Sequence, residues 1–421
     1  MPPRLIACLR DLDPPAGGAE MSLASLLNGV TDSGPLVSDA PDYTPCVKSP
    51  EIKSVLLKSG WRVDALQSGD RGEVTSLTAE TKLHREVASI SIESIWSGAA
   101  WRLRQHRTQR PNTRLQRIHL KRKNSEFKAW LRPKLAAAKS AADEAGDVLI
   151  GVTQLDWSAG AAAAFEEAQI PWLVFVRDEL QFQYPDIYRA SLESAAAVCG
   201  AGHGLLAQIK RKFNLQRAEH IPLPVDFGGR FGSLENIEKT RAAGLAGRVS
   251  SGDVDTPRIA IIGVTPEKGA MFYRKLLPAL MEAWPEAHID VYGSGSYAEA
   301  LGVFDNTTWH GHTAVTAVFS SSDIHLLTVQ STGSWGRVIN EAGLFGLPSV
   351  SVDIGSQSEA VGPGGIVVAA ESSMEDWIDA LRTTYEQRVE LGAAARQHAA
   401  VIDHRRSITM FRTLIENLGE I

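Results

Sequence analysis

The stretch from Asp323 to Phe345 reads DIHLLTVQSTGSWGRVINEAGLF and predicts the fold of the chain. It opens with a short apolar run, which is typical of a buried strand. A loop with Gly333, Ser334 and Gly336 follows, and a helical pattern begins at Arg337. A strand that leads through a glycine-bearing loop into a helix is the repeating unit of parallel α/β sheets.

The same alternation of strand and helix runs along the rest of the chain in two series. The first series has predicted strands at Arg4–Cys8, Trp61–Leu66, Asp147–Ile150, Trp172–Val176 and Ala196–Cys199, with helices at Ala159–Ala168 and Gly204–Phe213. The second has predicted strands at Arg258–Ile262, His288–Tyr292, Thr308–Trp309, Asp323–Leu327, Ser349–Val352 and Gly365–Val368, with helices at Met271–Ala283, Ala314–Ser320 and Arg337–Phe345.

Two series of this kind predict two domains. We place the first domain at residues 1–232 and the second at residues 257–395. Residues 233–256 are polar, contain Gly and Ser and lack apolar periodicity, which predicts a linker. Residues 396–421 predict a C-terminal helix that packs back on the first domain.

Composition excludes several classes of protein. The 421 residues include 43 Lys and Arg against 49 Asp and Glu, a net charge of −6, and 44% are hydrophobic, which excludes a mainly disordered chain. No apolar run reaches the roughly 18 residues that span a bilayer. Cys8, Cys46 and Cys199 have no metal-binding or redox spacing, so we predict a reduced, cytoplasmic protein.

Residues 101–134 depart from this composition. The segment is rich in Lys and Arg, contains Glu126 as its only acid, and carries Trp101, Phe127 and Trp130. Two interpretations stay open: a helix that attaches to the anionic inner face of a membrane, or a solvated helix that covers the sheet. We expect no nucleic acid partner, because the whole chain is acidic.

Two loops suggest an anion site. Gly17 and Gly18 follow the first strand, which alone is a weak signal, since such a pair is more often a tight turn and does not match the dinucleotide fingerprint G-x-G-x-x-G. Lys268, in the run Thr265–Gly269, follows the first strand of the second series. Taken alone, Lys268 is equally well an ordinary surface lysine.

The loop after Leu327 strengthens the prediction. Gly333, Ser334 and Gly336 expose backbone donors before a helix, and Arg337 lies in its first turn. Together with Lys268 these residues predict a cradle for a diphosphate without a metal-binding carboxylate cluster. Glu341, one turn further on, is placed to accept hydrogen bonds from a ribose.

The run from Thr265 to Val368 resembles the nucleotide-binding domain of the retaining GT-B glycosyltransferases, family four of the group 1 glycosyl transferases. The pieces that carry the resemblance are Pro266-x-Lys268-Gly269, Tyr292-Gly293-Ser294-Gly295, Ser322-Asp323-Ile324, Trp335-Gly336-Arg337-Val338-x-x-Glu341-Ala342, Gly346-Leu-Pro348 and Glu359-Ala-Val-Gly362. The resemblance implies two Rossmann-like domains that face each other across a cleft, and a hexosyltransferase-like activity of glycan biosynthesis.

The resemblance also implies roles for single residues. Lys268 and Arg337 would neutralise the diphosphate, Glu341 would bind the ribose, and Arg177 and Asp178 would lie at the reaction centre. The remaining residues of the expected donor site are Gly17, Gly18, Thr265, Gly293, Gly311, His312, Gly333, Ser334, Trp335 and Gly336. The donor would be a nucleotide-diphosphate sugar, used without metal or further cofactor, and the acceptor a glycan or a lipid-linked molecule.

Two departures from the family pattern keep alternatives open. Gly333 stands where the family usually has a glutamate that contacts the donor sugar, and Arg177 stands where it often has histidine. The alternatives are a nucleotide-sugar epimerase of the same fold and a catalytically silent sugar-nucleotide-binding protein.

Overall fold

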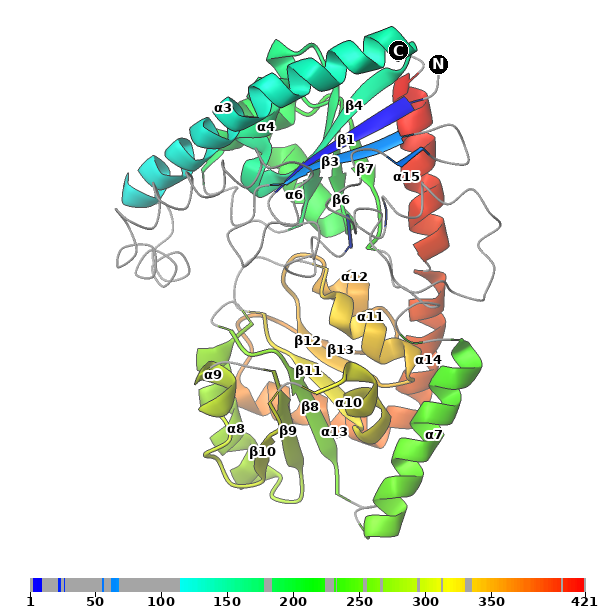
Figure 1. Cartoon of the computed structure of the whole chain (residues 1–421). Helices are drawn as coiled ribbons and strands as arrows, with labels where there is room; N and C mark the ends of the chain where they lie inside the picture. Colours follow the sequence, from blue (N-terminus) through cyan, green and yellow to red (C-terminus); the bar gives the residue numbers. More distant parts are fainter. Residues whose placement is uncertain are drawn as a thin grey trace. The chain divides into compact units, whose positions relative to one another are not determined.

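The computed structural model describes residues 3–9, 22–23, 26, 55–56, 62–67, 114–177, 184–223, 231, 233–252, 256–265, 268–293, 296–311, 313–329, 335–402 and 404–419. These residues form two α/β units (Figure 1). The first unit contains the described residues up to Leu223 together with helix α15 (His404–Gly419). The second contains the described residues from Phe231 to Ile402.

The first unit is built on a seven-stranded sheet. Its strands lie in the order β2 (Val55–Leu56), β3 (Arg62–Gln67), β1 (Pro3–Leu9), β4 (Val148–Gln154), β5 (Trp172–Val176), β6 (Ala197–Gly200) and β7 (Ala218–His220). All neighbours pair in parallel except β2, which runs antiparallel to β3. Helices cover both faces of a parallel sheet, so the side chains on both sides of its strands are buried and apolar.

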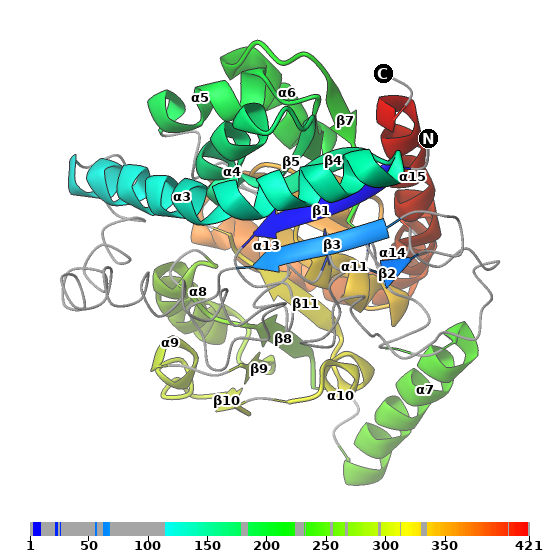
Figure 2. The same cartoon turned by 45° about the horizontal axis from the view of Figure 1, so that its top comes forward.

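The alternation of side chains along β1 assigns the two faces. Leu5 and Ala7 belong to the core that α15 covers, where Phe411 meets Phe175 edge-on at 5.4 Å between ring centroids. Ile6 and Cys8 belong to the opposite core. That core is covered by the helices α3 (Arg114–Ala145), α4 (Leu155–Glu167), α5 (Pro185–Glu193) and α6 (His203–Lys212) (Figure 2).

Helix α3 contains the described part of the basic segment. Its apolar residues Phe127, Trp130 and Leu131 are buried in the core of the first unit, so they are not available for insertion into a membrane. Several of its cations pair with acids of the unit: Arg117 with Asp186, Lys128 and Arg132 with Glu167, and Arg122 with Glu126. Of the helices that the structure describes, none is apolar enough over sufficient length to cross a bilayer.

The second unit is built on a six-stranded, fully parallel sheet. Its strands lie in the order β10 (Thr307–Trp309), β9 (His288–Tyr292), β8 (Arg258–Ile262), β11 (Ile324–Leu327), β12 (Ser349–Val352) and β13 (Gly365–Val368). The connecting helices are α8 (Ala270–Ala283), α9 (Ser296–Glu299), α10 (Val315–Ser321), α11 (Arg337–Leu344), α12 (Gln357–Val361), α13 (Met374–Glu386) and α14 (Arg388–Val401).

The order of these strands positions the site. The first three strands of the sheet in sequence, β8 to β10, extend it in one direction, and the next three, β11 to β13, extend it in the other. The order therefore reverses between the neighbours β8 and β11. In open parallel sheets, a crevice for ligands opens at the carboxyl ends of the strands at this switch point.

The structure corrects the predicted linker at residues 233–256. Helix α7 (Leu234–Ser251) occupies most of this range and belongs to the second unit. The Asn236 amide donates to Ser233 Oγ at 3.2 Å, and Gly252 ends the helix in the left-handed conformation at φ 76°. A Ser before the helix and a Gly after it are ordinary boundary signals, which the sequence analysis passed over.

Polar contacts hold α7, which is why it has no apolar stripe. Arg241 Nη1 donates to the carbonyl oxygens of Phe319 and Ser322 at 2.7 and 2.6 Å, at the end of α10. Gly244 permits a close approach, because a Cβ atom there would lie 2.5 Å from the Ser320 carbonyl oxygen. Tertiary contacts of this kind leave no periodic pattern in the sequence.

The predicted C-terminal helix over residues 396–421 is also corrected, because it is divided between the units. Its first part belongs to α14, which ends at Val401 in the second unit. Only α15 packs on the first unit.

Helix α4 provides a test of close packing. A Cβ atom on Gly160 would lie 2.3 Å from the Asn124 carbonyl oxygen of α3. Alanine usually stabilises a helix relative to glycine, but here we expect Gly160→Ala to lower the free energy of unfolding by about 1–3 kcal/mol through overpacking. Urea denaturation measures the change.

The control is Gly247→Ala in α7, where a Cβ atom would meet no atom within 4 Å. We expect this variant to be as stable as the parent or more stable by up to about 1 kcal/mol. A gain in stability for Gly160→Ala would contradict the close contact between α3 and α4.

Candidate functional site

Glycines line the carboxyl ends of three neighbouring strands in the second sheet. Gly263 follows β8, Gly293 follows β9 and Gly311 lies after β10, with φ angles of 68°, 120° and 66°. A side chain is strained in these conformations. A Cβ atom on Gly293 would also lie only 3.2 Å from Gly263 Cα. The sheet therefore ends in bare backbone, which a ligand can approach closely.

Lys268 lies in the turn between β8 and α8, beside this backbone. Its Nζ atom would lie 3.0 Å from a Cβ atom placed on Gly263. The Lys268 amide donates to Thr265 Oγ1 at 3.2 Å, and its carbonyl oxygen accepts from Thr328 Oγ1 at 3.3 Å. Because Thr328 follows β11, these contacts place Lys268 at the switch point between β8 and β11.

The charge of Lys268 is only partly compensated. Burial lowers the pKa of the Lys268 ammonium, and attraction to Glu341 opposes this effect. Glu341 is itself buried in α11, and its Oε1 atom accepts from Arg337 Nε at 2.9 Å. The site thus holds two cations and one carboxylate within a partly dry environment, where an anionic ligand is favoured.

The start of α11 forms the other wall of the site. Gly336 caps this helix at φ 68°, and a Cβ atom there would lie 2.5 Å from Gln357 Oε1 of α12. Buried Trp335 donates from Nε1 to Asn340 Oδ1 at 2.5 Å, which fixes the chain as it enters the helix. Since Gly269 caps α8 and Gly336 caps α11, no side chain of the capping residue covers the first amides of either helix.

The structure brings together Thr265, Lys268, Arg337 and Glu341, with Gly293, Gly311, Trp335 and Gly336 at the same sheet edge. Arg177 lies in the first unit, at the end of β5, with its guanidinium carbon 5.0 Å from the centroid of the Phe175 ring. Six predicted site residues lie outside the described residues: Gly17, Gly18, Asp178, His312, Gly333 and Ser334.

His325 is a residue of this region that the sequence analysis missed. It lies in β11, fully buried, with Nδ1 3.0 Å from Ser349 Oγ of the neighbouring strand. Among the described residues, no hydrogen-bond partner of Nε2 is present. Burial and repulsion from Lys268 lower the pKa of His325 to about 3, so the imidazole is neutral at pH 7. The only signal in the sequence was a polar residue inside an apolar run.

His310 has a structural role near the site. Its ring stacks on Tyr292 at 4.7 Å between centroids, and Nε2 lies 2.6 Å from Oδ1 of buried Asp290. Arg258 binds the same carboxylate through two nitrogens, at 2.6 and 2.8 Å. This network fixes the end of β9 beside Gly293, and its histidine is used for packing.

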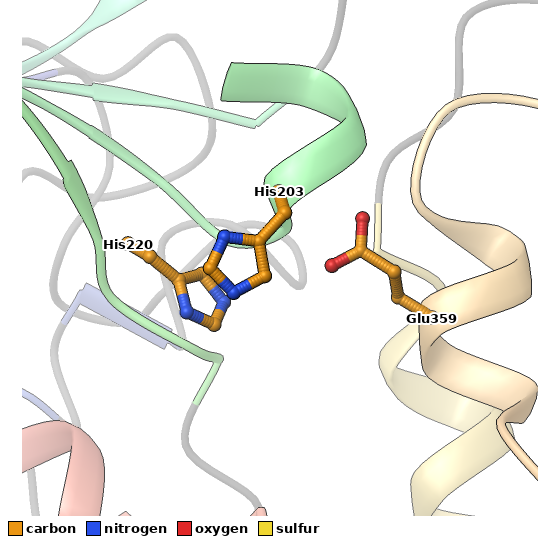
Figure 3. Close-up of side chains that lie close together, drawn as sticks. All are labelled: His203, His220 and Glu359. Atoms are coloured by element: carbon orange, nitrogen blue, oxygen red, sulfur yellow. The ribbon is translucent and has the colours of Figure 1, made fainter. Parts of the chain in front are cut away.

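A pair of histidines lies in the first unit. The rings of His203, at the start of α6, and His220, at the end of β7, have centroids 3.9 Å apart (Figure 3). The His220 Nε2 atom lies 3.0 Å from the Ala201 carbonyl oxygen. Two imidazoles are fewer than the three protein ligands of a typical catalytic zinc site, so this pair alone does not define a metal centre.

Comparison with protein families bears on the second unit. A family model described as glycosyl transferases group 1 matches residues 256–387, which contain the whole second sheet. No curated protein matches the sequence of this chain.

Solved structures resemble the whole chain. HepE from Anabaena in complex with UDP has a TM-score of 0.60 at 15% identity, covering 99% of this chain and 100% of that chain. Sucrose-phosphate synthase from Thermosynechococcus elongatus has a TM-score of 0.62 at 15% identity, covering 99% of both chains. The chain has the GT-B fold, with two parallel-sheet α/β domains.

The buried imidazole predicts sensitivity to acid. His325 has a pKa near 3 when folded against an ordinary 6.5, so below pH 6.5 the unfolded chain binds a proton that the native chain does not. Stability is therefore lost as pH falls from about 6.5 toward 3. We expect this residue to account for about 2 kcal/mol of unfolding free energy lost between pH 7.5 and pH 5.

The comparison variant is His325→Gln, which keeps a polar group near Ser349 Oγ and does not titrate. Urea denaturation at the two pH values gives the difference for each protein. The parent should lose about 2 kcal/mol more than the variant. Equal losses would show that His325 does not contribute to acid sensitivity.

Proposed function

We propose that this protein is a glycosyltransferase that moves a sugar from a nucleoside-diphosphate sugar to an acceptor, with retention of configuration at the anomeric carbon. The observation that carries the proposal is Lys268 at the switch point of the second sheet, beside the start of α11. The match of residues 256–387 to the group 1 glycosyl transferases supports the same activity.

The diphosphate of the donor binds between Lys268 and the start of α11. The amides at the starts of α8 and α11 donate to its oxygens, as helix N-termini do in many phosphate sites. Lys268 then gains the counter-ion that its surroundings lack, because Glu341 is already shared with Arg337. The glycines Gly263 and Gly293 let the ligand reach the backbone.

Glu341 binds the ribose of the donor. Arg337 holds its Oε1 atom, so the orientation of the carboxylate is fixed. Ribose hydroxyls are hydrogen-bond donors that suit such a carboxylate. This arrangement places the nucleoside along α11 and its diphosphate toward Lys268.

The reaction breaks the bond between the anomeric carbon and the diphosphate oxygen and forms a bond to the acceptor hydroxyl, whose proton is released. Negative charge develops on the departing diphosphate. Lys268, Arg337 and the helix amides stabilise this charge before the bond breaks, which is usually the largest single contribution to catalysis. Since two cations serve this purpose, we propose that turnover requires no metal ion.

The acceptor is proposed to be a glycan or a lipid-linked molecule in the cytoplasm. If the protein attaches to an anionic inner membrane surface, the contact is electrostatic, because the apolar side of α3 is buried. UDP-glucose is the first donor to test, since HepE has been solved with UDP and with UDP-glucose.

Replacement of the central cation tests the proposal. We expect Lys268→Ala to lower turnover by about 100- to 1000-fold, because one preorganised group that stabilises the leaving group is lost. Binding of UDP, measured by calorimetry, should weaken as well. Steady-state rates with UDP-glucose and a panel of glycan acceptors provide the readout.

The matched control is Lys275→Ala, which removes an exposed lysine of α8. This variant should retain the rate and the UDP affinity of the parent. Unchanged rates in Lys268→Ala would overturn the assignment of this site.

Product analysis tests the mechanism and separates the alternatives. We expect NMR to show that the anomeric configuration of the donor is retained, and excess EDTA to leave the rate unchanged. Conversion of UDP-glucose without an acceptor would indicate an epimerase. Binding of UDP-glucose without transfer to any acceptor would indicate a catalytically silent binding protein.

A further inference from the structure

A cluster of arginines lies at the opposite edge of the second sheet. A cavity of about 420 Å³, here called the arginine cavity, is lined by residues of α7 and α14, by Asp323 and by Phe345 and Gly346. Asp323 directly precedes β11, and Gly346 lies between α11 and β12. These positions are the amino ends of the strands, whereas Lys268 and Arg337 lie at the carboxyl ends. The arginine cavity is therefore separate from the proposed donor site.

The charges of this cavity are strongly unbalanced. Four of its lining residues are the arginines Arg241, Arg248, Arg388 and Arg396, and its one carboxylate is Asp323. Asp323 Oδ2 accepts from Arg248 Nη1 at 2.8 Å, so this pair is neutral. Arg396 pairs at 3.1 Å with Glu238, whose side chain is 60% exposed and therefore compensates it weakly. In the part of the chain that the structure describes, no carboxylate pairs with Arg241 or Arg388.

Arg241 is held rigidly in this surplus of positive charge. Its Nη1 atom donates to the Phe319, Ser320 and Ser322 carbonyl oxygens at 2.7, 3.1 and 2.6 Å. Burial lowers the pKa of Arg241 to about 10; attraction to Asp323 opposes this effect, and repulsion from Arg248 and Arg396 adds to it. The guanidinium stays charged at neutral pH, but its surroundings favour the arrival of an anion.

The hydrogen bonds that Arg241 and Arg388 donate to carbonyl oxygens leave some of their N–H donors for a ligand. Arg388 donates from Nη1 to the Tyr385 carbonyl oxygen at 2.8 Å, and Arg241 uses Nη1 alone for the contacts at the end of α10. A guanidinium carries five N–H donors, so several of them are available to phosphate oxygens. Fixed guanidinium groups suit phosphate because each can donate two parallel hydrogen bonds.

The rest of the lining is apolar and partly exposed. It consists of Leu245, Val249, Phe345 and Val389 with three small residues, and Val389 is 82% exposed. A volume of about 420 Å³ lies within the range of small-molecule sites. A ligand that fits such a lining carries phosphate at one end and a ring or apolar group at the other.

We propose that the arginine cavity binds a small organic phosphate ester, with its phosphate held by Arg241, Arg388 and Arg396. The ring or apolar part of the ester lies against Leu245 and Val389. This site is independent of the proposed donor site and of the sugar that is transferred.

Calorimetric titration of the full chain with phenyl phosphate tests the proposal. The parent and Lys268→Ala should bind with the same affinity, because Lys268 belongs to the other edge of the sheet. The double variant Arg388→Gln and Arg396→Gln should bind about tenfold more weakly or worse, since charge-assisted hydrogen bonds are lost. Arg382→Gln, an arginine outside the cavity lining, should bind like the parent.

A second variant avoids any loss of structural contacts. Val389→Asp adds a carboxylate to the lining at a highly exposed position in the first turn of α14, where an acid is compatible with the helix dipole. We expect it to weaken phenyl phosphate binding while the melting temperature without ligand stays close to that of the parent.

Three results would overturn the proposal. They are absence of phenyl phosphate binding to the parent, loss of binding in Lys268→Ala, and unchanged binding in both the double variant and Val389→Asp. The second of these would place the phosphate at the donor site.

Discussion

Strands β8 and β11 lie side by side in the second sheet although β9 and β10 separate them in sequence. Their connections leave the sheet in opposite directions, which in parallel sheets opens a crevice at the carboxyl ends of the two strands. Every proposed donor contact in the second unit depends on this arrangement, because Lys268 follows β8 and Arg337 follows β11. Because Gly263 and Gly293 have no side chains, the ligand can approach the backbone closely. Burial strengthens the electrostatic interaction between the ligand and each charged group of the site.

Charged groups are arranged in a similar way at both edges of the second sheet. At the carboxyl edge, a buried carboxylate is shared between two cations, and the imidazole below them stays neutral. At the amino edge, arginines satisfy the carbonyl oxygens at the ends of α10 and α11 while keeping further donors. Helix α11 extends from one edge to the other, from Arg337 to Leu344. In each place positive charge exceeds negative charge, which favours phosphate.

Local patterns predicted the second sheet closely, because each strand is a short apolar run bounded by turn residues. The strands at Arg258–Ile262, His288–Tyr292 and Ser349–Val352 have the bounds that the structure shows. Lys268, Arg337 and Glu341 were predicted as site residues because they follow such strands. Contacts between distant segments were out of reach: α7 is held by arginines on carbonyl oxygens 73 to 81 residues away, and the arginine cavity combines two helices far apart in sequence. Periodicity does not reveal such contacts.

Helix α15 determines which fragments of the chain can be expressed on their own. Because α15 supplies Ile408, Phe411 and Ile415 to the core of the first unit, that unit is discontinuous in sequence. A fragment that stops near residue 223 would keep all seven strands of its sheet yet leave one apolar face open to water. An expressed fragment intended to isolate the N-terminal half would need the terminal helix grafted back through a short connection. By contrast, the described residues of the second unit all lie between Phe231 and Ile402, so this stretch is the natural choice for separate expression.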